Sequence, residues 1–120
     1  MRFRKSLVLF NLHRAAQYGN RVIVVEGFFD CLKVHQAGLP CVVALMGCSL
    51  SARQEQLLTE HFREVIVLMD GDRAGRAAAA TIGPQLVTRL STRVVEVPMG
   101  TQPDQLGDEQ IRLLCIPDDF

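Results

Sequence analysis

The twelve residues "VIVLMDGDRAGR", residues 65–76, join an apolar run to two aspartates and then to a small, arginine-flanked stretch. The run that begins at Val65 has the length and composition of a buried β-strand. Asp70 and Asp72 follow it directly, separated by Gly71, and the residues after them predict a helix. Two interpretations of the aspartates are open at this point: a polar turn in which Asp72 caps the helix, or half of a metal site.

The sequence predicts the four strands of one sheet in four β-rich runs, at residues 22–25, 41–45, 65–69 and 93–97. The first three runs are apolar without alternation, which is typical of strands that are covered on both faces in a parallel sheet. Arg93 and Glu96 interrupt the fourth run, so we expect that strand near an edge.

Helical patterns separate these runs, at residues 28–37, 51–62 and 73–90, and a further helix is expected over residues 6–18. Ser51 and Gln54 have the spacing of a capping box. Gly83 and Pro84 predict a kink or a break in the third helix, since a proline inside a helix costs about 3 kcal/mol. The alternation of strands and helices predicts an α/β domain with a central, four-stranded, mostly parallel sheet flanked by helices.

The composition is that of a folded protein with one domain, residues 1–120, because 48% of the residues are hydrophobic and only 22% are charged. The longest apolar runs have about five residues, far below the ~20 that span a bilayer, so we expect a cytoplasmic protein without membrane contact. The four cysteines lack metal-ligand spacing, which favours free buried thiols over a zinc site. The formal net charge is zero, so we expect part of any grip on nucleic acid to come from elsewhere.

Carboxylates follow three of the four predicted strands, at the end of the sheet where open α/β folds bind ligands. They are Glu26, Asp30, Asp70, Asp72 and Asp104. Magnesium prefers oxygen ligands and typically takes one or two carboxylates together with phosphate oxygens. In an extended chain, residues two apart lie on one side, so Asp70 and Asp72 are predicted to converge on one ion.

Each of these residues also has a plainer interpretation. Glu26 reaches solvent at the end of a strand, Asp30 suits the first turn of a helix, and Asp104 begins a helix over residues 104–114. Arg73 and Arg76 either contact phosphate at the beginning of a helix or form its solvated face. The conjunction of several carboxylates at neighbouring strand ends favours the metal site.

Four blocks occur in order along the chain: "EGFFD" at 26–30, a block containing Gly47, Ser49 and Gln54, "DGDRAGR" at 70–76, and "PMGTQPDQL" at 98–106. Together they resemble the TOPRIM domain in the form found in bacterial-type DNA primases. The likeness covers about residues 5–106. It implies a lead-in helix within residues 1–20, a TOPRIM core at 21–106 and a C-terminal tail at 107–120.

The resemblance further implies a site for Mg²⁺, or Mn²⁺, that performs nucleotidyl transfer in the synthesis of primer RNA during DNA replication. Glu26, Asp70 and Asp72 correspond to the acidic set that TOPRIM enzymes share, with Glu26 as a metal ligand or a proton acceptor. Asp30 and Asp104 match further acidic positions of primases. The implied partners are a single-stranded DNA template and nucleoside triphosphates.

Two positions depart from the primase pattern, which usually has aspartate where this chain has Gln102 and threonine where it has Cys48. The lost carboxylate is expected to weaken a second metal position more than the first. Primases of this kind also carry a zinc-binding module, a basic template-binding subdomain and a helicase-contacting part. We therefore expect the chain alone to be weak or inactive, and to depend on such domains or on replication proteins.

Two alternatives remain beside the primase function. One is a stand-alone TOPRIM nuclease, which would use the same acidic residues on DNA phosphodiesters. The other is a non-catalytic module that binds nucleic acid or a protein partner and retains the fold, with Gln102 and the short chain in its favour.

Overall fold

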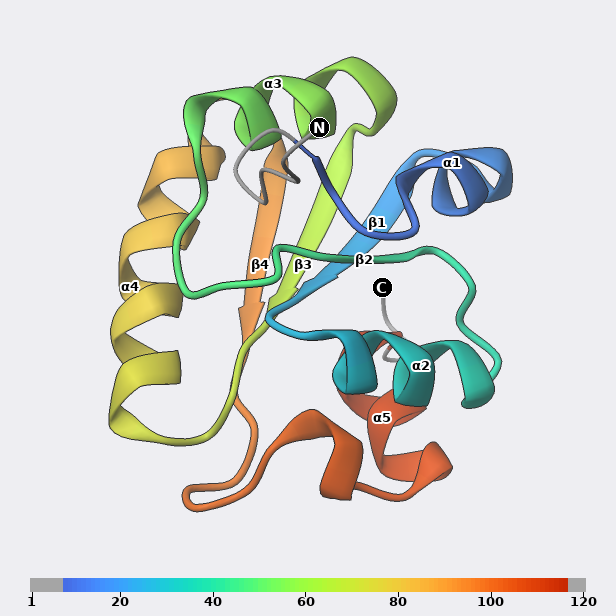
Figure 1. Ribbon diagram of the computed structural model, residues 1–120, viewed down its shortest axis with the longest axis vertical. Helices are drawn as coiled ribbons and strands as arrows, with labels where there is room; N and C mark the ends of the chain where they lie inside the picture. The colour runs from blue at the N-terminus through green and yellow to red at the C-terminus, as the bar shows by residue number, and fades with distance from the viewer. Residues whose placement is uncertain (1–7, 117–120) are drawn as a thin grey trace, which may run out of the picture.

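The computed structural model describes residues 8–116, and its centre is a four-stranded parallel sheet (Figure 1). The strands lie in the spatial order β2-β1-β3-β4, and they are β1 (Arg21–Val25), β2 (Val42–Ala44), β3 (Glu64–Leu68) and β4 (Ser91–Val95). All three pairings between neighbouring strands are parallel. The predicted α/β sheet is confirmed, and so is the edge position of the fourth strand.

Helices connect the strands and cover both faces of the sheet. They are α1 (Leu12–Ala15), α2 (Phe28–Gln36), α3 (Ala52–His61), α4 (Arg73–Val87) and α5 (Asp108–Cys115), with short 3₁₀ helices η2 (Ala16–Tyr18) and η3 (Pro103–Gln105). Figure 1 shows α3 and α4 on one side of the sheet and α2 and α5 on the other. Within the described residues, no helix is both long and apolar enough to cross a membrane.

The alternation of side chains along β1 divides the core into two layers. Val22 and Val24 belong to the layer under α3 and α4, where Leu58 and Ile82 are fully buried. The intervening Ile23 and Val25 belong to the layer under α2 and α5, with Val34, Ile111 and Cys115. Each buried valine or isoleucine contributes about 1.5–3 kcal/mol through the hydrophobic effect. A strand buried on both faces explains why the sequence shows apolar runs without alternation.

The fourth strand is shifted toward the N-terminus relative to the predicted run at 93–97. β4 begins at Ser91, whose N–H donates to the carbonyl of Arg63 over 3.1 Å. Ser91 and Thr92 are polar, so hydrophobic pattern alone did not place them in the strand. Pairing with β3 placed them there instead, since β3 supplies backbone hydrogen-bond partners for Ser91.

The predicted break in the third crossover is wrong, because α4 continues through Pro84 to Val87. Ile82 and Leu86 are fully buried on either side of the proline and hold both halves of the helix on the sheet. Pro84 itself is exposed, so its ring disturbs no packing toward the core. The helix still loses the backbone hydrogen bond that proline cannot donate.

The helix expected over residues 6–18 is also much shorter than predicted, and residues 6 and 7 lie outside the described part. Only α1 and the short η2 are helical there. Phe10 instead forms an antiparallel bridge with Ala44 at the outer edge of β2. Leu9, next to it, is buried. The local pattern favoured a helix, but the open edge of β2 offers this segment backbone partners that a helix would not use.

Candidate functional site

The acidic residues that the sequence predicts as metal ligands lie at the carboxyl ends of the strands. Glu26 follows β1, and Asp70 follows β3, which is the neighbouring strand. Asp72 is the N-cap of α4, Asp30 lies in the first turn of α2, and Asp104 lies in η3. The loop that leads from β4 to α5 runs beneath these strand ends in Figure 1. Parallel pairing therefore brings all five residues to one end of the sheet.

The turn at Asp70 is fixed by two glycines with no room for a side chain. A Cβ on Gly71 would collide with the carbonyl of Pro98, and a Cβ on Gly75 would collide with the backbone of Asp70. Gly71 also exchanges two backbone hydrogen bonds of 2.7 Å with the loop at Gly100 and Thr101. The two glycines of the "DGDRAG" pattern thus allow the turn, the β4–η3 loop and the beginning of α4 to pack closely together.

Asp72 caps α4, as the plainer interpretation of the sequence predicted. Its Oδ1 accepts a hydrogen bond from the N–H of Gly75 over 2.6 Å, which satisfies one of the free donors at the helix terminus. The residue is exposed, so its other carboxylate oxygen is not enclosed by the fold. A carboxylate can accept several hydrogen bonds, so one capping bond leaves acceptor sites of Asp72 free. The cap and a metal-binding role are therefore compatible.

Asp30 is a buried carboxylate, with only 7% of its surface exposed, and it links α2 to η3. Its Oδ1 accepts a hydrogen bond from the backbone N–H of Asp104 over 3.2 Å. Burial raises the pKa of Asp30, and the charges of Asp104 and Glu26 raise it further against that hydrogen bond. Asp30 therefore holds the β4–η3 connection against the site, a structural role that the sequence did not predict.

Asp70 lies at the electrostatic centre of the cluster. Burial, followed by the charges of Asp30, Glu26, Asp72 and Asp104, raises its pKa from 3.8 to about 7. Oδ1 of Asp70 and Oε1 of Glu26 are both buried without a hydrogen-bond partner. An orphaned buried carboxylate oxygen is costly, and a bound cation would offset both the desolvation and the mutual repulsion.

Cys48, one of the two departures from the primase sequence pattern, also lies at this site. It follows β2, it is exposed, and its Sγ lies 3.6 Å from Oε2 of Glu26. The charge of Glu26 raises the pKa of this thiol. Free thiols are confirmed for all four cysteines, but only Cys31 and Cys115 are buried as expected, since Cys41 is partly buried and Cys48 is exposed. Its place after a predicted strand was the signal that could have found it.

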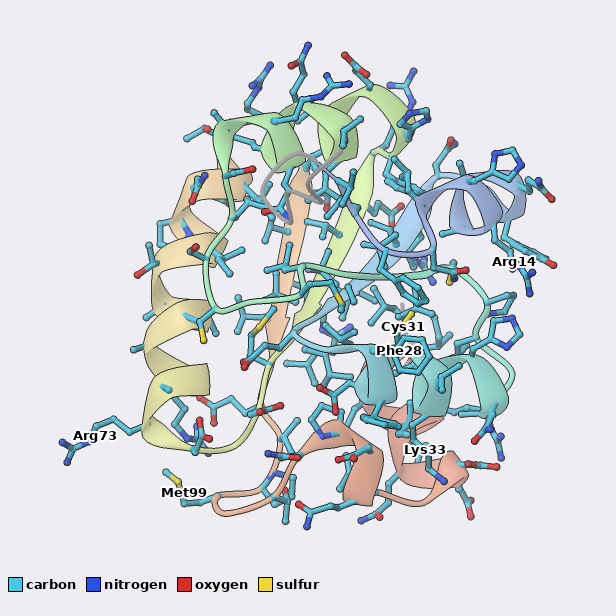
Figure 2. The ribbon with its side chains drawn as sticks, in the orientation of Figure 1. Arg14, Phe28, Cys31, Lys33, Arg73 and Met99 are labelled. Carbon is cyan, nitrogen blue, oxygen red and sulfur yellow. The ribbon has the colours of Figure 1, made fainter. Side chains whose placement is uncertain are left out.

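The two arginines at the beginning of α4 differ in their surroundings. Arg76 pairs with Glu96 over 3.2 Å and donates to the carbonyl of Val97 over 3.2 Å, while its Nε is buried without a partner. Arg73 is exposed and projects away from the sheet in Figure 2. Arg76 thus ties α4 to the end of β4, and Arg73 is the more accessible of the two.

The donor set is that of a hard cation, since Glu26, Asp70 and Asp72 offer only carboxylate oxygens. Within residues 8–116, no three aspartate, glutamate, histidine or cysteine side chains stand close enough to hold one ion in their present conformations. Two orphaned carboxylates nevertheless match the needs of magnesium, which keeps several waters and takes one or two protein carboxylates. The residues therefore fit such an ion.

DNA primases are among the known proteins that this chain resembles in sequence. The chain is 37% identical over 106 residues to the DNA primase of Staphylococcus epidermidis, covering 85% of this chain and 18% of that protein. It is 36% identical over 120 residues to the DNA primase of Aquifex aeolicus, covering 93% of this chain and 24% of that protein. The chain thus spans about a fifth of the length of these relatives.

Solved primase structures have the same fold. The zinc-binding and RNA polymerase domains of the Aquifex aeolicus primase superpose with a TM-score of 0.84 at 36% identity, over 94% of this chain and 30% of that one. A DnaG primase catalytic domain bound to single-stranded DNA gives a TM-score of 0.77 at 36% identity, over 92% of this chain and 38% of that one. The model of the Toprim-like family matches residues 23–107, so the chain belongs to that family, in the form of the TOPRIM domain of bacterial DNA primases.

Proposed function

We propose that the domain supplies the acidic, metal-binding half of a nucleotidyl transfer site for primer RNA synthesis, with Mg²⁺ or Mn²⁺ as its cofactor. The observation that carries the proposal is the pair of orphaned, buried oxygens on Glu26 and Asp70. These two residues would hold the ion, with Asp72 beside them. When bound, the ion would stabilise charge on the triphosphate and favour the deprotonated 3′-hydroxyl of the primer.

The chain's own residues support this site in distinct ways. Asp30 keeps the β4–η3 connection close to Asp70 by accepting the N–H of Asp104. The side chain of Asp104 is exposed, so it adds negative charge at the rim of the site and does not act as a buried ligand. Of the two arginines, Arg73 is proposed to contact nucleotide phosphate. Arg76 is engaged with Glu96 and Val97, and is proposed as a positioning residue.

The proposed substrates are nucleoside triphosphates and a single-stranded DNA template. Support comes from the DnaG catalytic domain bound to single-stranded DNA, which shares this fold at 36% identity. The net charge of zero offers no basic surplus to bind a template. We therefore propose that template binding depends on further primase domains or on replication proteins, and that the chain alone makes little primer.

Titration of the ¹⁵N-labelled protein with MgCl₂, followed by NMR, tests the metal site. We expect saturable shifts at the amides of Glu26 and of residues 70–72 at millimolar metal. Asp70→Asn should weaken the response at least tenfold. The matched control is Asp108→Asn, which removes an exposed carboxylate that pairs with Lys33 on another part of the surface. If the amides at the strand ends do not move, or if Asp70→Asn behaves as the control does, the proposal fails.

A non-catalytic module is the second candidate, and Gln102 favours it. This residue stands where primases usually have aspartate, and its backbone N–H is bonded to the side chain of Gln105 at the beginning of η3. A module of this kind would bind metal without transferring nucleotides. Primer synthesis on single-stranded DNA, assayed with the remaining domains of a related primase supplied in trans, separates the two candidates. Incorporation that Asp70→Asn abolishes supports the enzyme, and its absence supports the module.

A further inference from the structure

Three phenylalanine rings in mutual contact form an exposed aromatic patch. The centroid of the Phe28 ring lies 5.1 Å from that of Phe10 and 5.4 Å from that of Phe29, and both contacts are edge-to-face. Phe10 and Phe28 are 37% and 38% exposed, and Phe29 is 71% exposed. Single hydrophobic side chains are common on protein surfaces, but a contiguous exposed group of them indicates a binding surface. We call these three residues the aromatic patch.

The aromatic patch borders the acidic site through the first turn of α2. Phe28 and Phe29 follow Glu26 after a single glycine, so they begin the helix that leaves the carboxyl end of β1. Long side chains on a helix lean toward its N-terminus, which here is the end that Glu26 occupies. Asp30, the next residue, lies near enough to Asp70 for its charge to raise the pKa of that carboxyl. The patch and the carboxylates are therefore adjacent parts of one surface.

The two parts of this surface differ in chemistry, and together they describe one kind of ligand. The carboxylates attract an anion only through a divalent cation, whereas the rings offer planar apolar surface. A nucleotide matches both parts, since its phosphates bind a metal ion and its base stacks on aromatic rings. An apolar protein segment would cover the rings alone and leave the carboxylates uncompensated. The neighbouring acids therefore favour a nucleotide as the occupant of the aromatic patch.

Phe29 is the member of the aromatic patch with the most open ring. Phe28 has ring contacts on two sides, from Phe10 and from Phe29. Phe29 meets Phe28 at an interplanar angle of 83°, so this contact uses at most one face of the Phe29 ring. The high exposure of Phe29 leaves the other face to solvent. A base that stacks on this face needs no particular hydrogen-bond pattern, because every base has a π-face.

We propose that Phe29 is a stacking platform for the base of a nucleotide whose phosphates bind, through the metal ion, at Glu26 and Asp70. This proposal rests on the metal-binding function proposed above and adds a base-binding subsite to it. The ring binds and orients the nucleotide and accepts no proton from it. The stack increases the affinity for a nucleotide about tenfold and shows little preference among the four bases.

Phe29→Trp makes the platform report on its own occupancy, because the chain contains no tryptophan. The variant keeps an aromatic face, and a base stacked on it quenches its fluorescence. We expect ATP with excess Mg²⁺ to quench this signal saturably. Inorganic tripolyphosphate with Mg²⁺ has phosphates but no base, so it should compete with ATP without quenching. The matched control is Tyr18→Trp on η2, at an aromatic residue that is 56% exposed, and ATP should not quench it saturably.

Phe29→Leu tests the same subsite without a reporter, and it replaces an exposed side chain with another apolar one. In ¹⁵N NMR titrations with MgCl₂, the amides of residues 70–72 should respond as they do in the wild type. The variant should bind ATP about tenfold more weakly than the wild type, while its affinity for tripolyphosphate is unchanged. A merely structural role of Phe29 would not separate the two ligands in this way.

The outcomes separate this proposal from the one on which it rests. If the amides of residues 70–72 respond to Mg²⁺ but ATP binds no better than tripolyphosphate, the stacking platform is overturned and the metal site stands. If Mg²⁺ shifts none of those amides, the metal site fails and the platform fails with it. If the remaining domains of a related primase change the fluorescence of Phe29→Trp and ATP does not, the aromatic patch is a protein interface and the proposal is overturned.

Discussion

At the amino end of the sheet, Glu55 accepts hydrogen bonds from Gln85 and Arg89, whereas at the carboxyl end the buried Oδ1 of Asp70 has no partner. The pKa values follow this difference. The hydrogen bond from Gln85, helped by Arg89, lowers the pKa of Glu55, while burial and four neighbouring acids raise the pKa of Asp70 to about 7. One end of the domain satisfies its charges, and the other accumulates charge that the fold leaves uncompensated.

This contrast separates residues that stabilise the fold from residues that the fold holds at a cost. Arg21 and Glu64 form a further ion pair of 3.0 Å at the amino end, between β1 and β3. No comparable pair neutralises Asp70 or Glu26 among the described residues. Buried charge without a partner is unfavourable, and it persists only where the surrounding structure holds it in place. Such groups concentrate at functional sites. Substitutions can therefore test how tightly the carboxyl end is packed, how much its charge destabilises the fold, and whether the amino end behaves in the opposite way.

The largest effect is expected from Gly75→Ala, because the added Cβ would meet the backbone of Asp70. We expect a loss of about 2–3 kcal/mol in the free energy of unfolding, after the ~1 kcal/mol that alanine gains over glycine in a helix. The matched control is Gly47→Ala at the same end of the sheet, where nothing lies within 4 Å of the new Cβ. Urea unfolding followed by circular dichroism measures both. Equal stability of the two variants would contradict the close packing of α4 on the Asp70 turn.

A smaller effect, with a definite sign, is expected from Asp70→Asn. The folded-state pKa of about 7 lies above the ordinary value of 3.8, so between these values the native state binds the proton more tightly than the unfolded state does. Stability of the wild type therefore falls as pH rises through this window. At pH 8 the variant should be more stable by on the order of 1 kcal/mol, once solvent screening is allowed for, and at pH 4 the two should be equal.

Unfolding curves at pH 4, 6 and 8 measure this difference, and added magnesium sharpens it. Millimolar Mg²⁺ should stabilise the wild type at pH 8 and leave Asp70→Asn unchanged, since binding to the native state alone adds to its stability. A variant that is less stable than the wild type at pH 8 without metal would mean that Asp70 has a stabilising partner. That result would remove the contrast between the two ends of the sheet.

The sequence predicted the sheet well because its strands are buried on both faces, so hydrophobicity alone marks β1, β2 and β3. It predicted the ends of strands and helices less well where backbone hydrogen-bond partners, and not side chains, determine the local structure. Ser91 joins β4 by pairing with β3, Phe10 bridges to Ala44 instead of extending a helix, and α4 survives Pro84 through burial on both sides of it. These are tertiary effects that no local pattern contains.

The residues of the candidate site also divide into those that the sequence could place and those that depend on tertiary contacts. Glu26, Asp70 and Asp72 could be placed at one end of the sheet from the sequence, because parallel strands deliver their carboxyl ends together. The sequence could not show that Asp30 is buried and bonded to Asp104, or that Cys48 lies against Glu26. Both contacts depend on the path of loops that hydrophobic periodicity does not describe. Whether these acids bind metal stays a prediction for the titration above.

The smallest effect is expected from Glu55→Gln at the amino end. The pKa of Glu55 is lowered in the folded state, so its ionised form contributes stability above the unfolded pKa and loses that contribution as pH falls through the folded value. The variant should be less stable at pH 8 by about 0.5 kcal/mol, the usual size for a pair near the surface, and should equal the wild type at pH 3. This dependence on pH is opposite in sign to that of Asp70→Asn.

The control for this last measurement is Glu60→Gln on the same helix, where the carboxylate accepts a hydrogen bond from the side chain of Gln56. Unfolding of both variants across pH 3–8 isolates the contribution of Gln85 and Arg89, because the charge removed is the same. Added salt should shrink the difference, since Arg89 is half exposed. If Glu55→Gln instead gained stability with rising pH, both ends of the sheet would carry uncompensated acids. Charge repulsion would then no longer distinguish the candidate site from the rest of the domain.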